Sequence, residues 1–116
     1  MIVVFVSGPI TDGGRLTYDE QRDAANAGVR AGIELAQAGY APYIPHLNWF
    51  HPDTKVMDSW YEVDLAVLER CDAVVRLPGQ SYGAYYEEMR AHTLGIPVFG
   101  SVVELVEADK AGVFAL

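Results

Sequence analysis

Short apolar runs rich in β-branched residues alternate with longer stretches of helical periodicity along this chain, and this alternation limits the possible folds more than any other feature. The first run, Ile2 to Ser7, is continuously apolar apart from its last residue, as in a strand buried on both faces. Further strands are predicted at Ala41 to Pro45, at Asp72 to Leu77 and at Ile96 to Phe99. Strands separated by helices indicate a mostly parallel sheet covered on both faces. We therefore predict one α/β domain over residues 1–116, doubly wound (flavodoxin-like or Rossmann-like), with four to five strands.

Helices are predicted between these strands from periodic apolar positions and capping residues. They run from about Thr17 to Ala38, from a cap at Ser59 to about Arg70, from a cap at Ser81 to about Leu94, and onward from about Val102. His46 to Lys55 is predicted as a loop. Ligands of such sheets bind beyond the carboxyl ends of the strands. The segments expected to converge there are Ser7-Gly8-Pro9-Ile10, Pro45-His46 and Pro78 to Gly83.

Composition narrows the classes of partner. Hydrophobic residues make up 51% of the 116 residues, which argues against disorder, and the net charge of -8 argues against a nucleic-acid duplex or an anionic membrane as partner. The single cysteine, Cys71, excludes an internal disulfide and a CxxC metal site, and is interpreted as a buried thiol. The N-terminal run lacks a basic region before it and is interpreted as a strand, not a signal peptide. These features predict a cytoplasmic protein with no metal and no cofactor.

The segment Ser81-Tyr82-Gly83-Ala84-Tyr85-Tyr86-Glu87 follows a predicted strand and opens a predicted helix. Ser81 can cap the helix, Gly83 lets a ligand approach the backbone, and the helix dipole favours a phosphate at this end. Glu87 lies one turn deeper on the same face as Gly83, where a carboxylate could attack a sugar carbon. An ordinary capped helix with a solvated Glu87-Glu88 pair is the alternative that spacing leaves open.

A second carboxylate, Asp64, falls in the middle of a predicted helix, where aspartate is an unfavourable residue. It is either exposed or directed into the site, where it could bind a sugar hydroxyl or pass a proton to a leaving base. Cleavage of a glycosidic bond uses two carboxylates in this way. His46, after the second strand, is either incidental or in contact with a base or phosphate.

Three blocks of sequence together resemble the nucleoside 2-deoxyribosyltransferase superfamily, including its nucleoside 5′-monophosphate N-glycosidase branch and short phage-type relatives. They are Phe5-Val6-Ser7-Gly8-Pro9-Ile10; Asp64-Leu65 followed by Cys71-Asp72-Ala73-Val74-Val75; and Ser81-x-Gly83-Ala84-x-x-Glu87 with Gly95-Ile96-Pro97-Val98. The blocks span nearly the whole chain in the order found in that family.

The resemblance implies that Glu87 is a nucleophile forming a glycosyl-enzyme intermediate, and that Asp64 contacts the sugar or assists the departing base. It implies that Ser81, Gly83 and the loop from Gly8 to Arg15 hold a 5′-phosphate, which favours a nucleotide over a free nucleoside. It also implies a homodimer or higher homo-oligomer. The resulting substrate-binding candidates are Phe5, Ser7, Gly8, Pro9, Ile10, Arg15, His46, Ser81 and Gly83.

Two departures from the family pattern affect this interpretation. Transferases of the family place a tyrosine where Phe5 stands, and its hydroxyl helps to position the nucleophile; the C-terminus is also short. Hydrolysis by water is favoured over transfer to a second base, with base and sugar left open. A non-catalytic nucleotide-binding or sensing module on the same fold is the alternative, and Phe5 is the residue that favours it.

Overall fold

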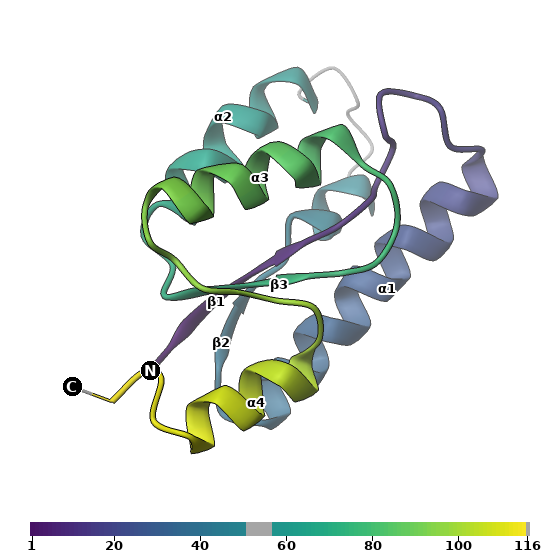
Figure 1. The fold of residues 1–116 in the computed structure, drawn as a ribbon. Coiled ribbons are helices and arrows are strands. Elements are labelled where there is room, and N and C mark those ends of the chain that lie inside the picture. Colours follow the sequence, from purple (N-terminus) through teal and green to yellow (C-terminus); the bar gives the residue numbers. More distant parts are fainter. Residues whose placement is uncertain (51–56, 116) are drawn as a thin grey trace.

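The computed structural model describes residues 1–50 and 57–115. Its elements in chain order are β1 (Val3–Ser7), α1 (Tyr18–Gln37), β2 (Ala41–Tyr43), the 3-10 helix η1 (Pro45–Phe50), α2 (Met57–Leu68), β3 (Ala73–Arg76), α3 (Tyr82–Thr93), β4 (Val98–Phe99) and α4 (Val102–Lys110). The four strands form one all-parallel sheet in the order β2-β1-β3-β4. Helices α1 and α4 cover one face of the sheet, and α2 and α3 cover the other (Figure 1). The predicted doubly wound α/β fold is confirmed.

Strand β1 lies inside the sheet and contributes to both layers of the core, because alternate side chains point to opposite faces. Val4 and Val6 pack with Leu35 of α1 and Leu105 of α4. Phe5 packs on the other face, in a cluster with residues of α2, β3 and α3. Ser7 follows Phe5 by two positions and therefore points to the same side, toward α3. This alternation decides which helix the end of β1 meets.

Local sequence signals account for most of the helix ends. Thr17 caps α1 in a capping box with Glu20, Ser81 caps α3 through the Ala84 N–H, and Ser101 caps α4. Gly95 follows α3 with a φ of 73°, a conformation that suits glycine. The caps predicted at Ser81 and the stop at Gly95 are confirmed.

Two predicted boundaries were wrong. Ser59 does not cap a helix, because α2 already begins at Met57, and serine is tolerated inside a first turn as well as at a cap. The predicted loop from His46 to Lys55 is a 3-10 helix over its first part, since η1 runs from Pro45 to Phe50 and the second strand ends at Tyr43. The remainder of that predicted loop lies outside the described residues.

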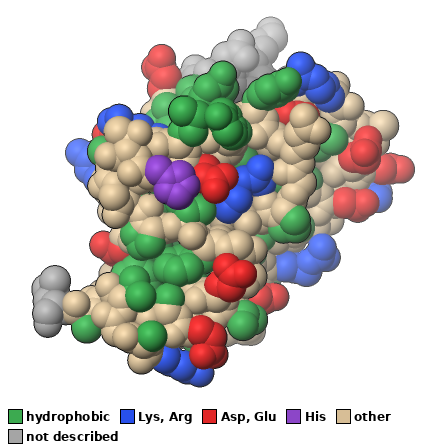
Figure 2. Space-filling model, in the orientation of Figure 1, with side chains coloured by type: hydrophobic (Ala, Val, Ile, Leu, Met, Phe, Trp, Pro, Cys, Tyr) green, Lys and Arg blue, Asp and Glu red, His purple; other side chains and the backbone are tan. Residues whose placement is uncertain are grey.

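The surface over α3 combines charged and apolar groups (Figure 2). Arg76 lies 3.8 Å from Glu88, and Glu88 lies 3.7 Å from His92, so the Glu88 carboxylate lies between a guanidinium and an imidazole on this face. Tyr85, Tyr86 and other apolar side chains of the helix are about half exposed. In the part of the chain that the structure describes, no helix is long and apolar enough to cross a membrane.

Candidate active site

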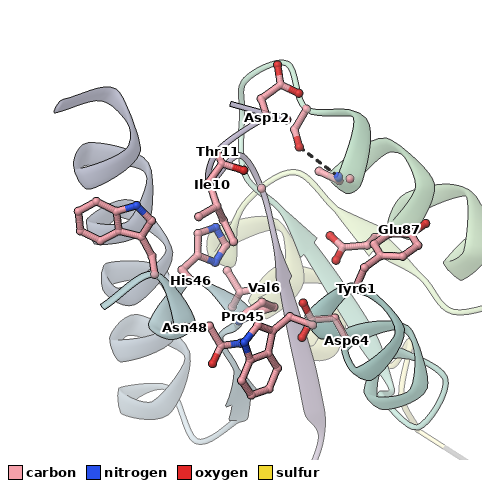
Figure 3. A pocket seen from close by; sticks show the side chains of 17 residues that line it. Val6, Ile10, Thr11, Asp12, Pro45, His46, Asn48, Tyr61, Asp64 and Glu87 are labelled. Atoms are coloured by element: carbon pink, nitrogen blue, oxygen red, sulfur yellow. Dashed lines mark hydrogen bonds between the residues drawn. The ribbon is translucent and has the colours of Figure 1, made fainter. Parts of the chain in front are cut away.

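The order of the strands places a crevice at the carboxyl ends of β1 and β3. The chain leaves β1 toward β2 on one side and later returns to β3 on the other, which is the switch point where ligands of such sheets bind. A pocket lies there, lined by residues of the loop after β1, of η1, of α2 and of the start of α3 (Figure 3). Its lining comprises Val6, Gly8, Ile10, Thr11, Asp12, Gly13, Pro45, His46, Asn48, Trp49, Trp60, Tyr61, Asp64, Ser81, Gly83, Ala84 and Glu87.

Glu87 projects from α3 into this pocket and is only 8% exposed, so it is not part of a solvated pair. The buried Ser7 hydroxyl, at the end of β1, donates a hydrogen bond of 2.7 Å to its carboxylate. Burial raises the pKa of Glu87 to about 7; the Asp64 charge adds to this effect, while the Ser7 hydrogen bond and Arg76 oppose it. At neutral pH this carboxyl group is therefore close to its midpoint of ionisation.

Asp64 projects from α2 into the same pocket and is 9% exposed, which settles the question of whether it faces solvent. The Tyr43 hydroxyl, at the end of β2, donates to it at 2.8 Å. Burial raises the pKa of Asp64, and the Tyr43 hydrogen bond opposes that rise. The Asp64 charge is one of the effects that raise the pKa of Glu87, so the two carboxyl groups are electrostatically coupled.

His46 lies across the pocket from Glu87 (Figure 3) and is 1% exposed. Neither ring nitrogen has a hydrogen-bond partner among the described residues. Burial lowers the pKa of His46 to about 4, although the nearby polar backbone of Pro9 acts to raise it by a smaller amount. The ring is therefore neutral near pH 7. A neutral imidazole carries one donor and one acceptor, and a bound ligand could satisfy either of them.

The position of His46 depends on a glycine of α1. A Cβ added at Gly28 would lie 2.2 Å from the imidazole Cγ, so the ring packs directly on the helix backbone. A Cβ at Gly32, one turn along, would instead lie 2.1 Å from Ile44 Cδ1, outside the pocket lining.

We expect Gly28→Ala and Gly32→Ala each to lower the free energy of unfolding by about 1–3 kcal/mol through overpacking. Only Gly28→Ala should also weaken ligand binding per folded molecule, because it moves His46. Thermal unfolding and ligand titration of both variants check this. Equal loss of binding in the two variants would show that His46 placement is not the cause.

The loop after β1 meets the start of α3. The Tyr82 N–H donates to the Asp12 side chain at 3.2 Å, and the Ala84 N–H donates to the Ser81 hydroxyl at 3.2 Å. Gly83 lines the pocket between these two contacts. The Arg15 side chain is 61% exposed and its guanidinium lies 4.8 Å from the centre of the Tyr82 ring. The helix start is thus supplied with acceptors by the protein itself.

The structure brings together most of the residues that the sequence suggested for a site. Those lining the pocket are Gly8, Ile10, His46, Asp64, Ser81, Gly83 and Glu87. Ser7 lies behind Glu87 and acts on it through its hydroxyl. Pro9 and Arg15 are outside the lining. Phe5 is wrong as a ligand contact, because it is fully buried in the core and stacks on Tyr43 with ring centres 5.4 Å apart.

Several residues in or beside the pocket were not individually assigned to the site from the sequence; Tyr43 lies outside the lining and contacts Asp64 from behind it. Tyr43 bonds to Asp64, 21 positions away, and Asp12 bonds to the Tyr82 N–H, 70 positions away. Contacts between residues so far apart in the sequence leave no local pattern from which they could be predicted. Trp49, Trp60 and Tyr61 line the pocket as well, and the only signal for them was the aromatic richness of their segments. Among the described residues, no group of three or more histidine, cysteine, aspartate or glutamate side chains could hold a metal ion.

No curated protein matches the sequence. A 2-deoxyribosyltransferase from the psychrotolerant bacterium Bacillus psychrosaccharolyticus has a similar structure, with a TM-score of 0.56 and 16% identity, over 92% of this chain and 80% of that one. At this identity the likeness shows a shared fold. The model of the family described as a domain of unknown function, DUF4406, matches residues 2–100, and the chain therefore belongs to the DUF4406 family.

Proposed function

We propose that this protein cleaves the N-glycosidic bond of a nucleoside or nucleotide, with Glu87 as the nucleophile. The observation that carries the proposal is the pair of buried carboxylates, Glu87 and Asp64, which enter one pocket from two helices and are each held by a separate hydroxyl. Glycosidic bond cleavage is a reaction that uses two carboxyl groups in distinct ionisation states. The shared fold with a 2-deoxyribosyltransferase supports the same reaction class.

The residues that line the pocket have distinct roles in this reaction. The ionised Glu87 carboxylate attacks the anomeric carbon, a C–O bond forms, and the base leaves with the electron pair of the C–N bond. Asp64 accepts a hydrogen bond from a sugar hydroxyl. Trp49, Trp60 and Tyr61 offer aromatic faces on which a base can stack. Water, or a second base, then attacks the glycosyl-enzyme ester and releases Glu87.

The Ser7 hydroxyl can take the role that the resemblance assigns to a tyrosine hydroxyl at position 5, where this chain has Phe5. Ser7, two residues further along β1, faces α3 and donates to Glu87 at 2.7 Å. A hydroxyl beside the nucleophile is therefore present even though Phe5 lacks one. This removes the main sequence argument for a non-catalytic nucleotide-binding module.

The direct test is chromatographic detection of free base after incubation with a panel of ribo- and deoxyribonucleosides and their 5′-monophosphates. A second free base in half of the tubes distinguishes transfer from hydrolysis, because only transfer makes a new nucleoside or nucleotide. Release of base supports the proposal. Ligand binding without release from any member of the panel would contradict it and favour the binding module.

The pH dependence of the rate distinguishes the roles of the two carboxylates. A nucleophile must be ionised, and the pKa of Glu87 is about 7, so kcat/KM should rise as the pH increases through about 7. If Glu87 were instead the general acid and Asp64 the nucleophile, kcat/KM would fall over the same range. Initial rates of base release between pH 5 and 9 give the sign.

A further inference from the structure

The start of α3 already carries an anion that belongs to the protein. A helix N-terminus attracts negative charge because its first N–H groups lack partners within the helix. Here the Asp12 carboxylate accepts from the Tyr82 N–H at 3.2 Å, and the Ser81 hydroxyl accepts from the Ala84 N–H at 3.2 Å. Asp12 therefore occupies one of the N–H groups at the helix start where a phosphate was expected from the sequence.

Asp12 is held in this place by its own loop. Its φ is 49°, a left-handed conformation that aspartate and asparagine tolerate better than most residues. Its side chain is only 8% exposed and lines the pocket. The loop is closed by backbone hydrogen bonds from Gly14 to the Thr11 carbonyl at 3.1 Å and from Arg15 to the Asp12 carbonyl at 3.2 Å. The carboxylate is therefore a fixed part of the pocket wall.

The charges around the pocket disfavour a second anion. Three carboxyl groups line it (Asp12, Asp64 and Glu87), and no lysine or arginine is present among the described lining residues. Arg15 lies 4.0 Å from Asp12 but is directed over the exposed Tyr82 ring. Arg76 donates to the backbone carbonyls of Leu77 and Gly79 instead of to the pocket. A phosphate dianion here would meet three carboxyl groups at short range, while Arg15 and Arg76, the cations beside Asp12 and Glu87, both lie outside the lining.

We propose that Asp12 is a specificity residue that selects an uncharged 5′-hydroxyl and rejects a 5′-phosphate, so that the substrate is a free nucleoside. The inference rests on the proposed N-glycosidic activity and deepens it. One carboxylate oxygen stays on the Tyr82 N–H, and the other accepts from the 5′-hydroxyl. This inference differs from the preference for a nucleotide drawn from the sequence, because the sequence pattern around Ser81 and Gly83 could not show the carboxylate contributed by the loop after β1.

The test compares kcat/KM for a nucleoside and for its 5′-monophosphate in the native protein and in Asp12→Asn. Asparagine keeps the shape, the backbone conformation and an acceptor for Tyr82, and removes only the charge. We expect the native protein to favour the nucleoside, and the ratio of monophosphate to nucleoside to rise at least about tenfold in Asp12→Asn. Asp19→Asn is the matched control, since Asp19 is exposed on α1 and pairs with Arg22; its ratio should be unchanged.

A native preference for monophosphates, or an unchanged ratio in Asp12→Asn, would overturn the role of Asp12 while leaving the glycosidase intact. Absence of base release from every compound would instead reject the proposed function. In that case calorimetric dissociation constants for the same two ligands decide the point. Tighter binding of the nucleoside that is lost in Asp12→Asn would support the inference, and equal binding or none would reject it.

Discussion

Replacing Glu87 with glutamine is expected to lower the rate of base release by at least about a thousandfold, since the amide cannot form the glycosyl ester. The fold should remain intact. Glutamine has the same shape as the carboxyl group, and its carbonyl oxygen can still accept from the Ser7 hydroxyl. Chromatographic rates of the native protein and of the variant, each at saturating substrate, measure the loss.

The same variant should be more stable than the native protein above pH 7. Burial raises the pKa of Glu87 from 4.5 to about 7, so the folded state holds a proton that the unfolded state releases between these values. The native protein therefore loses about 3 kcal/mol of stability as the pH rises from about 4.5 to about 7, and Glu87→Gln does not. Denaturant unfolding of both proteins should give equal free energies of unfolding at pH 4 and a higher value for Glu87→Gln at pH 8.

Glu88→Gln is the neighbouring control. Glu88 is a half-exposed residue of α3 that lies near Arg76 and His92 outside the pocket lining. This variant should retain activity and show no gain in stability above pH 7. Activity retained in Glu87→Gln would remove the nucleophile from the mechanism, and a stability gap that is the same at both pH values would contradict the raised pKa.

Asp64→Asn should lower base release by about a hundredfold or more, because the carboxyl group proposed to orient the sugar is lost. It should also move the midpoint of the pH profile to lower pH. The Asp64 charge is one of the effects that raise the pKa of Glu87, so its removal makes Glu87 easier to ionise. Rates of base release between pH 5 and 9, for the native protein and for Asp64→Asn, measure both the loss of rate and the change in the midpoint of the pH profile.

Tyr43→Phe tests the Glu87–Asp64 pair by removing the hydrogen bond that Asp64 accepts. Tyr43 donates to Asp64, and loss of this hydrogen bond should raise the pKa of Asp64 without removing the carboxylate. The rate should therefore fall less than in Asp64→Asn. A midpoint in Asp64→Asn that stays in place or moves to higher pH would show that the two carboxylates are not electrostatically coupled.

The sequence was sufficient for the fold wherever a local pattern decides the structure. Buried parallel strands are continuous apolar runs, and helix ends carry their own caps, as at Ser81 and Gly95. It failed at η1, where Pro45 ends the extended chain and opens a short 3-10 helix that no apolar period marks. It failed again at Ser59, because a capping residue type does not fix a cap position.

For the site, the sequence found residues whose place follows from the ends of strands and the starts of helices, such as Glu87 and Gly83. It could not find the partners that set their chemistry. Ser7 and Glu87 are 80 positions apart, and their hydrogen bond exists only because β1 and α3 are packed together. Asp12 lies in the loop from Gly8 to Arg15 that the resemblance singled out, but its approach to the start of α3 is seen only in the folded structure.

The central position of β1 links Glu87 to both layers of the hydrophobic core. This strand pairs with β2 and β3, packs in both core layers, and ends in the hydroxyl that holds Glu87. The Ser7–Glu87 contact cannot open by fraying of an edge strand, since its anchor separates from the sheet only when both layers come apart. Opening of the backbone that positions Ser7 therefore requires disruption of the sheet on both sides of β1, and hydrogen exchange at β1 would report on that event.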